Sequence, residues 1–406
     1  MIKIRILDDE PNKRESFRKL VLGAGVPSEY DIKLIGPEEV KASFGAMLAR
    51  QSEFRERGYW NIETSDMPLD GIDILIVDNE LREFFQEIGI FTSADEVAYM
   101  TRCFSTCKLI LIVNRTTPNP FDLTGNASYL GQFEAFSDLE IGQAQLSSKA
   151  LWGTGDDAFH PWYWFVLPKW LDEFDRRLED AKDGLRTDVD ILTFFGLEGV
   201  KEWLPRRVLQ TLGDGMQYTF REFVLSSSFA LGPKDRAPLR NREFEEPSIE
   251  NLAPIVAARL WKWLEVQVLP ELDILVDAPH LVMRFPSLLV GEQGDLKTWN
   301  AVAVRHDDQI PNMTMELLDS HRFSREHWLS RPAWYWRKVM NDETIPDVRA
   351  PWNIEYVPWA FCEDTSRFQP KEETKTYRTA VESPFGLRNI EKLAGVDYQP
   401  LQRLAM

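Results

Sequence analysis

The sequence has few cysteines and no long apolar run, and each shortage excludes a class of protein. Three cysteines among 406 residues cannot form a disulfide framework. Cys103 and Cys107 stand one helical turn apart, but no second pair of metal ligands lies near them in the sequence, so we expect buried thiols rather than a zinc site. No apolar run reaches the length of a membrane span, and the polar start at Met1–Arg5 does not have the pattern of a secretion signal. We therefore expect a cytoplasmic protein that does not enter a membrane.

Positive charge is also in short supply. The chain has 47 Lys and Arg against 65 Asp and Glu, which gives a formal net charge of −18. Such a chain repels phosphate backbones, and this disfavours nonspecific binding to nucleic acids. We expect protein partners instead, in a hetero-complex or an oligomer.

What is present indicates a folded chain with an α/β first half. At this length, about two to three domains are expected, and the 44% hydrophobic content is that of a globular protein. Strand-like apolar segments alternate with helical ones, and the third and fourth segments are apolar enough to be covered on both faces. This pattern predicts a doubly wound, parallel five-stranded sheet. The five expected strands are Ile2–Leu7, Asp31–Ile35, Gly71–Leu81, Lys108–Asn114 and Trp162–Pro168.

The second half has a different pattern. Residues 115–155 are rich in Pro, Gly, Ser and Asn, which predicts an insertion within the first domain. A boundary near residue 183 is expected to separate this domain (1–183) from a mainly helical α+β domain (184–406). After about residue 290 the second domain becomes irregular and rich in tryptophan.

Acidic residues stand at the ends of two predicted strands. Asp8 and Asp9 follow the first strand directly, and Asp78 ends the apolar core of the third. In a sheet of order 2-1-3-4-5 these strands are neighbours, so the three carboxylates meet at one edge. Like charges that close raise one another's pKa values or hold a hard cation, and oxygen ligands of this kind suit Mg²⁺. The spacing therefore predicts a magnesium site.

Two segments, "IRILDDEP" and "DILIVDNEL", resemble the first and third strands of the receiver domain of bacterial response regulators. The resemblance covers about residues 1–183. It implies that Asp78 accepts a phosphoryl group and that Asp8 and Asp9 bind Mg²⁺, with the carbonyl of Glu80 completing the metal shell. The chemistry implied is attack of a carboxylate on a phosphoryl group whose charge the cation neutralises.

The chain departs from that family at its switch positions. The family ends its fourth strand in Thr or Ser, where this chain has Asn114, and an amide cannot rearrange on phosphorylation as a hydroxyl does. The family has Lys before a proline at the end of its fifth strand, whereas Leu167 stands there and Lys169 comes one place after the proline; a second alignment puts His160 at this position. We predict an atypical receiver used as a protein-interaction module. A working phospho-receiver and an unrelated α/β domain stay open as alternatives.

Histidines and acids of the second half offer a rival hypothesis. His306, Asp307 and Asp308 are consecutive, and His321 and His327 follow, a set from which a metal-dependent hydrolase or nuclease can be imagined. Isolated surface histidines are the other interpretation. Whether the chain is an enzyme stays open.

Three further polar residues lie among apolar or irregular sequence. His280, in "DAPHLVMRFP", has the surroundings of a hydrogen-bonded core histidine. Glu363 and Asp364 fall in an expected loop, "CEDTSRF", where they can act as ligands or as helix caps.

The tryptophans are the last notable feature. The chain has 14, and four of them stand close to arginine and tyrosine in the last quarter. Such residues are typical of interface hot spots, and they also fill the cores of loop-rich domains, so both interpretations stay open. The four candidates are Trp334, Trp336, Trp352 and Trp359.

Together these features predict a bacterial signalling or regulatory protein. Its atypical receiver domain is expected to work as an adaptor in a multi-protein assembly, for example in a stress or phage-defence system. The alternative is an effector hydrolase or nuclease that the receiver-like domain controls.

Overall fold

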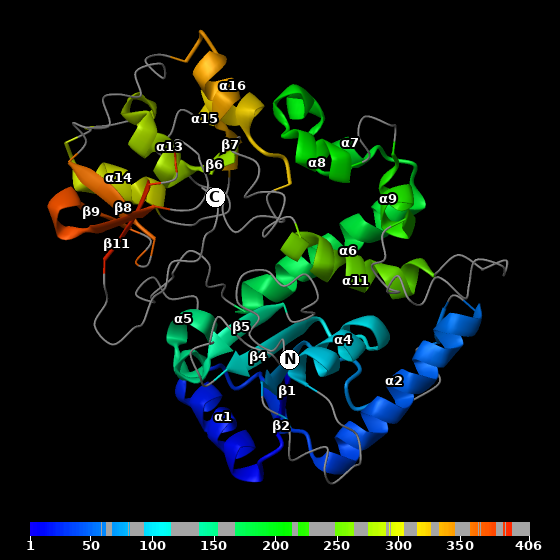
Figure 1. Ribbon diagram of the computed structural model, residues 1–406. Helices are drawn as coiled ribbons and strands as arrows, with labels where there is room; N and C mark the ends of the chain where they lie inside the picture. Colours follow the sequence, from blue (N-terminus) through cyan, green and yellow to red (C-terminus); the bar gives the residue numbers. More distant parts are fainter. Residues whose placement is uncertain are drawn as a thin grey trace. The chain divides into compact units, whose positions relative to one another are not determined.

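We describe the fold from a computed structural model of the whole chain, drawn in Figure 1. Strands and helices alternate along the first half of the chain, and the helices and strands of the second half are shorter. The residues that the structure describes are 1–57, 59–61, 67–79, 81, 93–114, 138–152, 167–212, 218–226, 248–263, 275–289, 292, 294–303, 315–325, 333–345, 358–363, 365, 367–378, 385 and 387–391.

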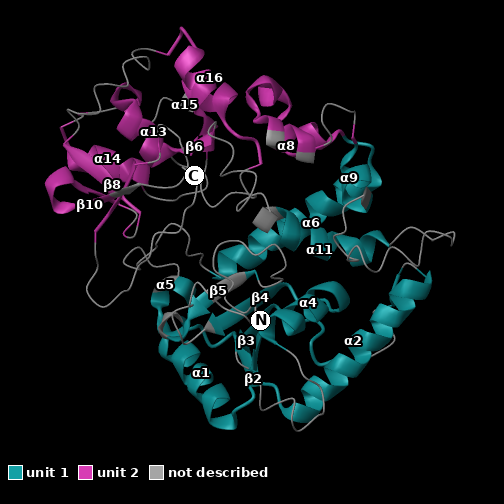
Figure 2. Ribbon diagram, viewed as in Figure 1, with its two compact units in different colours: residues 1–156, 166–189, 219–262 teal, residues 157–165, 190–218, 263–406 magenta. Residues whose placement is uncertain are grey.

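The chain forms two compact units, coloured separately in Figure 2. The first contains residues 1–156, 166–189 and 219–262, and the second contains 157–165, 190–218 and 263–406. The chain therefore leaves the first unit and returns to it twice, at residues 157–165 and 190–218, and the second departure comes shortly after the boundary expected near residue 183.

The first unit is built on a five-stranded, fully parallel sheet of order β2-β1-β3-β4-β5, which confirms the predicted topology and the α/β fold class. The two central strands β3 and β4 are buried along their length in the described residues, because helices cover both faces. The strands are β1 (Lys3–Leu7), β2 (Asp31–Leu34), β3 (Ile74–Asp78), β4 (Leu109–Asn114) and β5 (Leu139–Gly142).

The fifth strand is not where the sequence pattern predicts it. β5 is only four residues long, at Leu139–Gly142, whereas the prediction was Trp162–Pro168. Leu167 and Pro168 instead begin helix α6 (Leu167–Arg186), where proline is tolerated because the first turn has no intrahelical acceptor for its missing N–H. Of the predicted strand, residues 162–166 lie outside the described residues.

One face of the sheet is covered by α2 (Pro37–Arg57) and α4 (Ala94–Phe104). Apolar residues recur on α2 at helical spacing, so Val40, Phe44 and Met47 enter the same buried cluster as alternate residues of the strands. This cluster also holds the inward residues of α4, and it is the main core of the first unit.

The other face carries α1 (Pro11–Gly23), as Figure 1 shows. Its Phe17 and Val21 are one turn apart and buried, and the helix packs on β1, β2 and the short 3-10 helix η2 (Gln143–Ser147). Helix α5 (Lys149–Trp152) follows η2. The sheet is thus wound on both sides, as predicted.

Three helices from later in the sequence complete the first unit: α6, α9 (Phe220–Ser226) and α11 (Ile249–Trp263). Ile255 of α11 joins the core cluster of α2 and α4, and Phe174 of α6 packs against α11. α6 also contacts α9. Sequence beyond residue 183 therefore supplies part of the core of the first unit.

The second unit is an α+β structure with its own core. Its apolar cluster gathers residues of several short helices and of two small sheets, one of order β10-β11-β8-β9 and one of β6 paired with β7. The helices are α7 (Ile191–Phe194), α8 (Arg206–Thr211), α13 (Ala278–Arg284), α14 (Leu296–Ala303), α15 (Met315–Leu318) and α16 (Trp336–Asn341). The strands are β6 (Leu275–Asp277), β7 (Ala333–Tyr335), β8 (Trp359–Cys362), β9 (Arg367–Pro370), β10 (Lys375–Arg378) and β11 (Leu387–Ile390).

The fold bears on the predictions about membrane spans and about the cysteines. Within the described ranges, none of the helices combines the length and the apolar character that a membrane crossing requires. All three cysteines are buried free thiols, and burial raises the pKa of Cys103 and of Cys107 to about 12, so they stay protonated and unreactive.

Candidate metal centre at the carboxyl edge of the sheet

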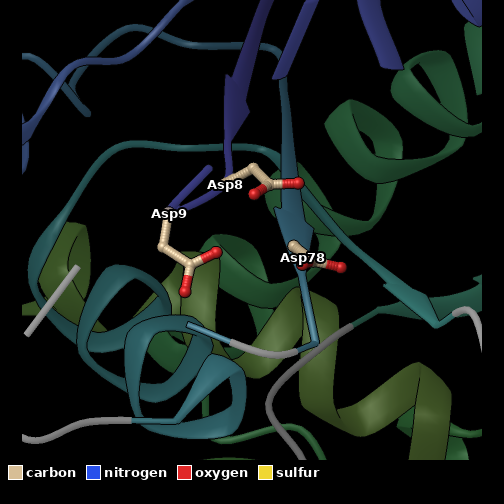
Figure 3. A group of neighbouring side chains, drawn as sticks. All are labelled: Asp8, Asp9 and Asp78. Atoms are coloured by element: carbon tan, nitrogen blue, oxygen red, sulfur yellow. The ribbon is translucent and has the colours of Figure 1, made fainter. Parts of the chain in front are cut away.

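Asp8, Asp9 and Asp78 meet where two neighbouring strands end. β1 pairs with β3 in parallel register up to Leu7 opposite Val77, so the next residue of each strand is an aspartate at the same edge. One carboxylate oxygen from each of the three aspartates lies within 4.8 Å of the others. Figure 3 shows the three side chains at the ends of these strands. The prediction that these carboxyl groups lie together is confirmed.

Local structure fixes the acidic pair. Glu10 is the N-cap of α1, so Asp8 and Asp9 form a two-residue link between β1 and that helix. The backbone N–H of Glu10 donates to Oδ1 of Asp8 at 2.8 Å. This bond holds the Asp8 carboxyl group against the strand ends rather than toward solvent.

Burial makes this arrangement costly unless a cation is present. Asp8 is 0% exposed and Asp78 is 3% exposed. The second oxygen of Asp8, Oδ2, is buried and accepts no hydrogen bond from any residue that the structure describes. Buried carboxylate oxygens are nearly always hydrogen-bonded or bound to metal, so this oxygen has the surroundings of a ligand atom.

The electrostatics of the site point the same way. Burial, followed by the charge of Asp78 and the contact with Asp9, raises the pKa of Asp8 to about 8, and Lys13 opposes this shift. Lys13 is itself paired with Glu10. Without a further positive charge, the cluster therefore keeps a proton on Asp8 near neutral pH.

The donor set fits a hard divalent cation. Three carboxylates offer only oxygen, which Mg²⁺ binds at about 2.0–2.1 Å while it keeps several waters. Oxygens within 4.8 Å of one another can reach one such ion directly or through one of its waters. In the described part of the chain, this is the only group of three or more His, Cys, Asp or Glu side chains with that geometry. The implied fourth ligand, the carbonyl of Glu80, lies outside the described residues.

Neither a protein-family model nor a curated protein matches the chain. The interpretation of the acidic site therefore depends on the sheet topology and on the positions of the three carboxyl groups.

The predicted switch positions do not gather at this site. Asn114 ends β4, at the correct edge of the sheet, but its side chain lies outside the described residues. Leu167 and Lys169 lie in the first turn of α6, so the prediction that Leu167 ends the fifth strand and that Lys169 directly follows that strand is wrong. β5 ends at Gly142 and Gln143 follows, so no lysine stands at that strand end.

The acids and histidines predicted as ligands in the second half form no comparable cluster among the described residues. Of them, only His321 is described, and its Nε2 lies 2.8 Å from Oδ2 of Asp342. His306, Asp307, Asp308 and His327 lie outside the described residues, so the hydrolase hypothesis stays a prediction.

The tryptophans belong to the core rather than to an exposed surface. Trp334 and Trp336 are buried in the apolar cluster of the second unit, and the half-buried Trp359 packs against it. Trp352 lies outside the described residues. Their positions favour the core interpretation over the interface interpretation.

His280 and Glu363 have a shared partner that the sequence pattern did not identify. Both are buried, which agrees with the prediction for His280, and both accept hydrogen bonds from Arg388 on β11. Asp364 lies outside the described residues. Arg388 stands 108 residues after His280 in an unremarkable sequence, so no local signal could have found it.

Proposed function

We propose that the first unit is a receiver-like regulatory module that binds Mg²⁺ through Asp8, Asp9 and Asp78, and that the chain is a signalling or regulatory protein that acts through protein contacts. The observation that carries the proposal is the meeting of three carboxyl groups at the ends of β1 and β3 in a sheet of order 2-1-3-4-5. Sites of this kind lie at the carboxyl ends of strands in open α/β sheets.

A cation resolves the charge problem of the site. Two buried carboxyl groups and a third beside them stay compact only if a proton or a metal ion offsets their charge. Mg²⁺ would bind the oxygens that face one another, including Oδ2 of Asp8, and supply that positive charge.

We further propose that the module does not switch as typical receivers do. Two departures support this: Asn114 replaces the hydroxyl residue at the end of β4, and Gly142 and Gln143 stand where the family has its lysine at the end of β5. The lysine charge that would contact a phosphoryl group on Asp78 is missing there. A site that binds a metal ion but lacks the hydroxyl and the lysine suits a module that a protein partner recognises.

Titration of the full chain with MgCl₂, followed by calorimetry, tests the metal site. Wild type is expected to bind one Mg²⁺, and Asp8→Asn or Asp78→Asn to lower the affinity by at least about tenfold, the minimum expected from losing a ligand. The control is Glu56→Gln, which neutralises an exposed carboxylate on α2 away from the strand ends. Equal binding by all four chains would place the metal elsewhere.

Beryllofluoride with Mg²⁺ tests the atypical switch. We expect metal binding without a stable adduct on Asp78, measured by mass spectrometry under native conditions and by ¹⁹F resonances. An adduct that Asp78→Asn abolishes would make this a working phospho-receiver and overturn the proposal of an inactive switch.

A further inference from the structure

A buried polar network in the second unit joins three segments that are far apart in the sequence. Asp277 ends β6 and caps α13, and His280 lies in the first turn of that helix. Glu363 follows β8, and Arg388 lies on β11. All four residues are between 0% and 4% exposed, so they are as deeply buried as the apolar residues around them.

The hydrogen bonds fix the protonation state of the histidine. Nδ1 of His280 lies 2.5 Å from Oδ1 of Asp277, a carboxylate oxygen that can only accept. Nη1 of Arg388 lies 2.5 Å from Nε2 and 3.0 Å from Nδ1 of His280, so a guanidinium, which can only donate, lies against both ring nitrogens. The bond to Asp277 therefore assigns the proton of the ring to Nδ1, and the adjacent positive charge of Arg388 disfavours a second proton on Nε2.

A second proton on His280 cannot be accommodated without movement. It would sit on Nε2 and face an N–H of Arg388, which replaces a hydrogen bond with two like charges in contact. Oε1 of Glu363 is 3.5 Å from Nε2 and at present accepts from Arg388 at 2.7 Å. The protonated ring would compete with Arg388 for that carboxylate, and the guanidinium would lose both of these bonds.

We propose that the network is an acid-sensitive lock, which holds β8 and β11 to the β6–α13 corner while His280 is neutral and opens when His280 takes up one proton. In the open form His280 pairs with Asp277 and Glu363, and Arg388 leaves with β11. Because β11 lies between β8 and β10, its displacement separates the strands of the four-stranded sheet. This inference concerns the second unit alone and does not depend on the metal site.

The charges around the ring set the direction of the response. Burial and then the positive charge of Arg388 lower the pKa of His280 below its ordinary value, while Asp277 and Glu363 oppose this shift from β6 and from the end of β8. The edge of Phe361 packs on the ring and adds no charge. The open form therefore binds the proton more tightly than the closed form, and the closed form loses stability as the pH falls below the ordinary histidine range.

Hydrogen exchange of the full chain, followed by mass spectrometry between pH 7.5 and pH 5, tests the lock. Rates are divided by those of unstructured peptides at each pH. We expect peptides that contain β8 and β11 to lose protection on acidification, with an opening constant that rises up to tenfold per pH unit, the limit for one proton. Peptides that contain β1 and β3 of the first unit serve as the internal reference and are expected not to show this one-proton opening.

Two variants separate the lock from general acid sensitivity. His280→Gln keeps a neutral donor and acceptor near Asp277 and Arg388 but cannot titrate, so its β8 and β11 peptides are expected to stay protected at pH 5. His321→Gln removes another buried histidine of the second unit and is expected to open as wild type does. Equal acid-induced opening in wild type and His280→Gln would overturn the proposal.

A measurement on wild type alone covers the case in which His280→Gln does not fold. The five histidine side chains can be titrated by NMR. We expect the ring of His280, identified by its contact with Phe361, to stay neutral below the ordinary histidine range and its resonance to change together with the loss of protection in β11. Titration of that resonance at or above the ordinary value, with β8 and β11 still protected, would overturn the proposal.

Discussion

The two units bury carboxyl groups in opposite ways. At the strand ends of the first unit, Asp8 and Asp78 are buried beside Asp9, and all three members of this group are acidic. In the second unit, Asp277 and Glu363 are just as buried, but Arg388 and His280 lie between them. The buried carboxyl groups of the second unit are paired with an arginine of the same unit. In the proposed function, those of the first unit instead bind a cation from solution.

The largest effect on stability is expected from replacing Arg388, the cation of the buried network in the second unit. Arg388→Met keeps most of the side-chain volume but leaves Glu363 buried without the donor seen here, which is expected to destabilise the second unit by about 3–5 kcal/mol. Denaturant unfolding with hydrogen exchange resolved for each unit measures the loss. Adding Glu363→Gln to Arg388→Met should recover part of it. A loss below about 1 kcal/mol would show that the arginine does not hold the network together.

The corresponding substitution in the first unit, Asp8→Asn, is expected to increase the free energy of unfolding rather than lower it. Wild-type Asp8 must take up a proton on folding near neutral pH, whereas Asp8→Asn is neutral in both states, so the metal-free first unit should gain about 1–3 kcal/mol, within the usual range for one substitution. Unfolding in EDTA measures this gain, and the added stability that Mg²⁺ gives wild type should disappear. Glu56→Gln is the control. A net loss of stability in EDTA would mean that Asp8 is structural, like Asp277.

The pH dependence of Mg²⁺ binding tests whether Asp8 carries a proton in the metal-free site. The pKa of Asp8 is raised to about 8, so the metal-free site holds a proton that Mg²⁺ must displace. Affinity should rise by up to about tenfold per pH unit toward pH 8 and then level off. The stability of the metal-free first unit changes with pH in the opposite direction. Because the pKa of Asp8 is raised in the folded state, the stability is greatest at low pH and is lost as the pH rises through about 8.

Calorimetry in two buffers with different ionisation enthalpies measures the number of protons released. We expect close to one at pH 7 and close to none at pH 9.5. Release that does not change over this range would contradict the proton competition at Asp8.

The smallest expected effect comes from Lys13, the cation that opposes the raised pKa of Asp8. Lys13 is paired with Glu10 at the start of α1, and its side chain is partly exposed. Lys13→Met should strengthen Mg²⁺ binding by less than about 1 kcal/mol, as expected for a screened charge, and this gain should vanish in high salt. Weaker binding after this change would show that Lys13 helps to build the site.

The sequence predicted the acidic site because all its signals are local. β1 and β3 are mostly apolar, and Asp8, Asp9 and Asp78 stand at their ends, so strand order alone brings the three aspartates together. The fifth strand was missed because Leu139–Gly142 is four residues long with no apolar periodicity, while the stronger apolar run stands beside Leu167.

Sequence patterns could not predict the buried polar network around His280 and Arg388, for a different reason. His280 and Arg388 meet only through the fold, and each is an ordinary residue in its own segment. Trp334 illustrates the same limit, because an aromatic residue beside arginine has the same local sequence in a core as at an interface. Tertiary contacts, rather than periodicity, decide such cases.

The order of strands in the small sheet of the second unit has a consequence for synthesis on the ribosome. β11 is the last strand among the described residues, yet it lies inside the sheet, parallel to β8 and antiparallel to β10. The first unit can complete its sheet once residue 142 has emerged, but the second must wait for Leu387–Ile390. A nascent chain halted before Leu387 would display two strand edges with unpaired backbone groups, the kind of surface that chaperones and proteases recognise.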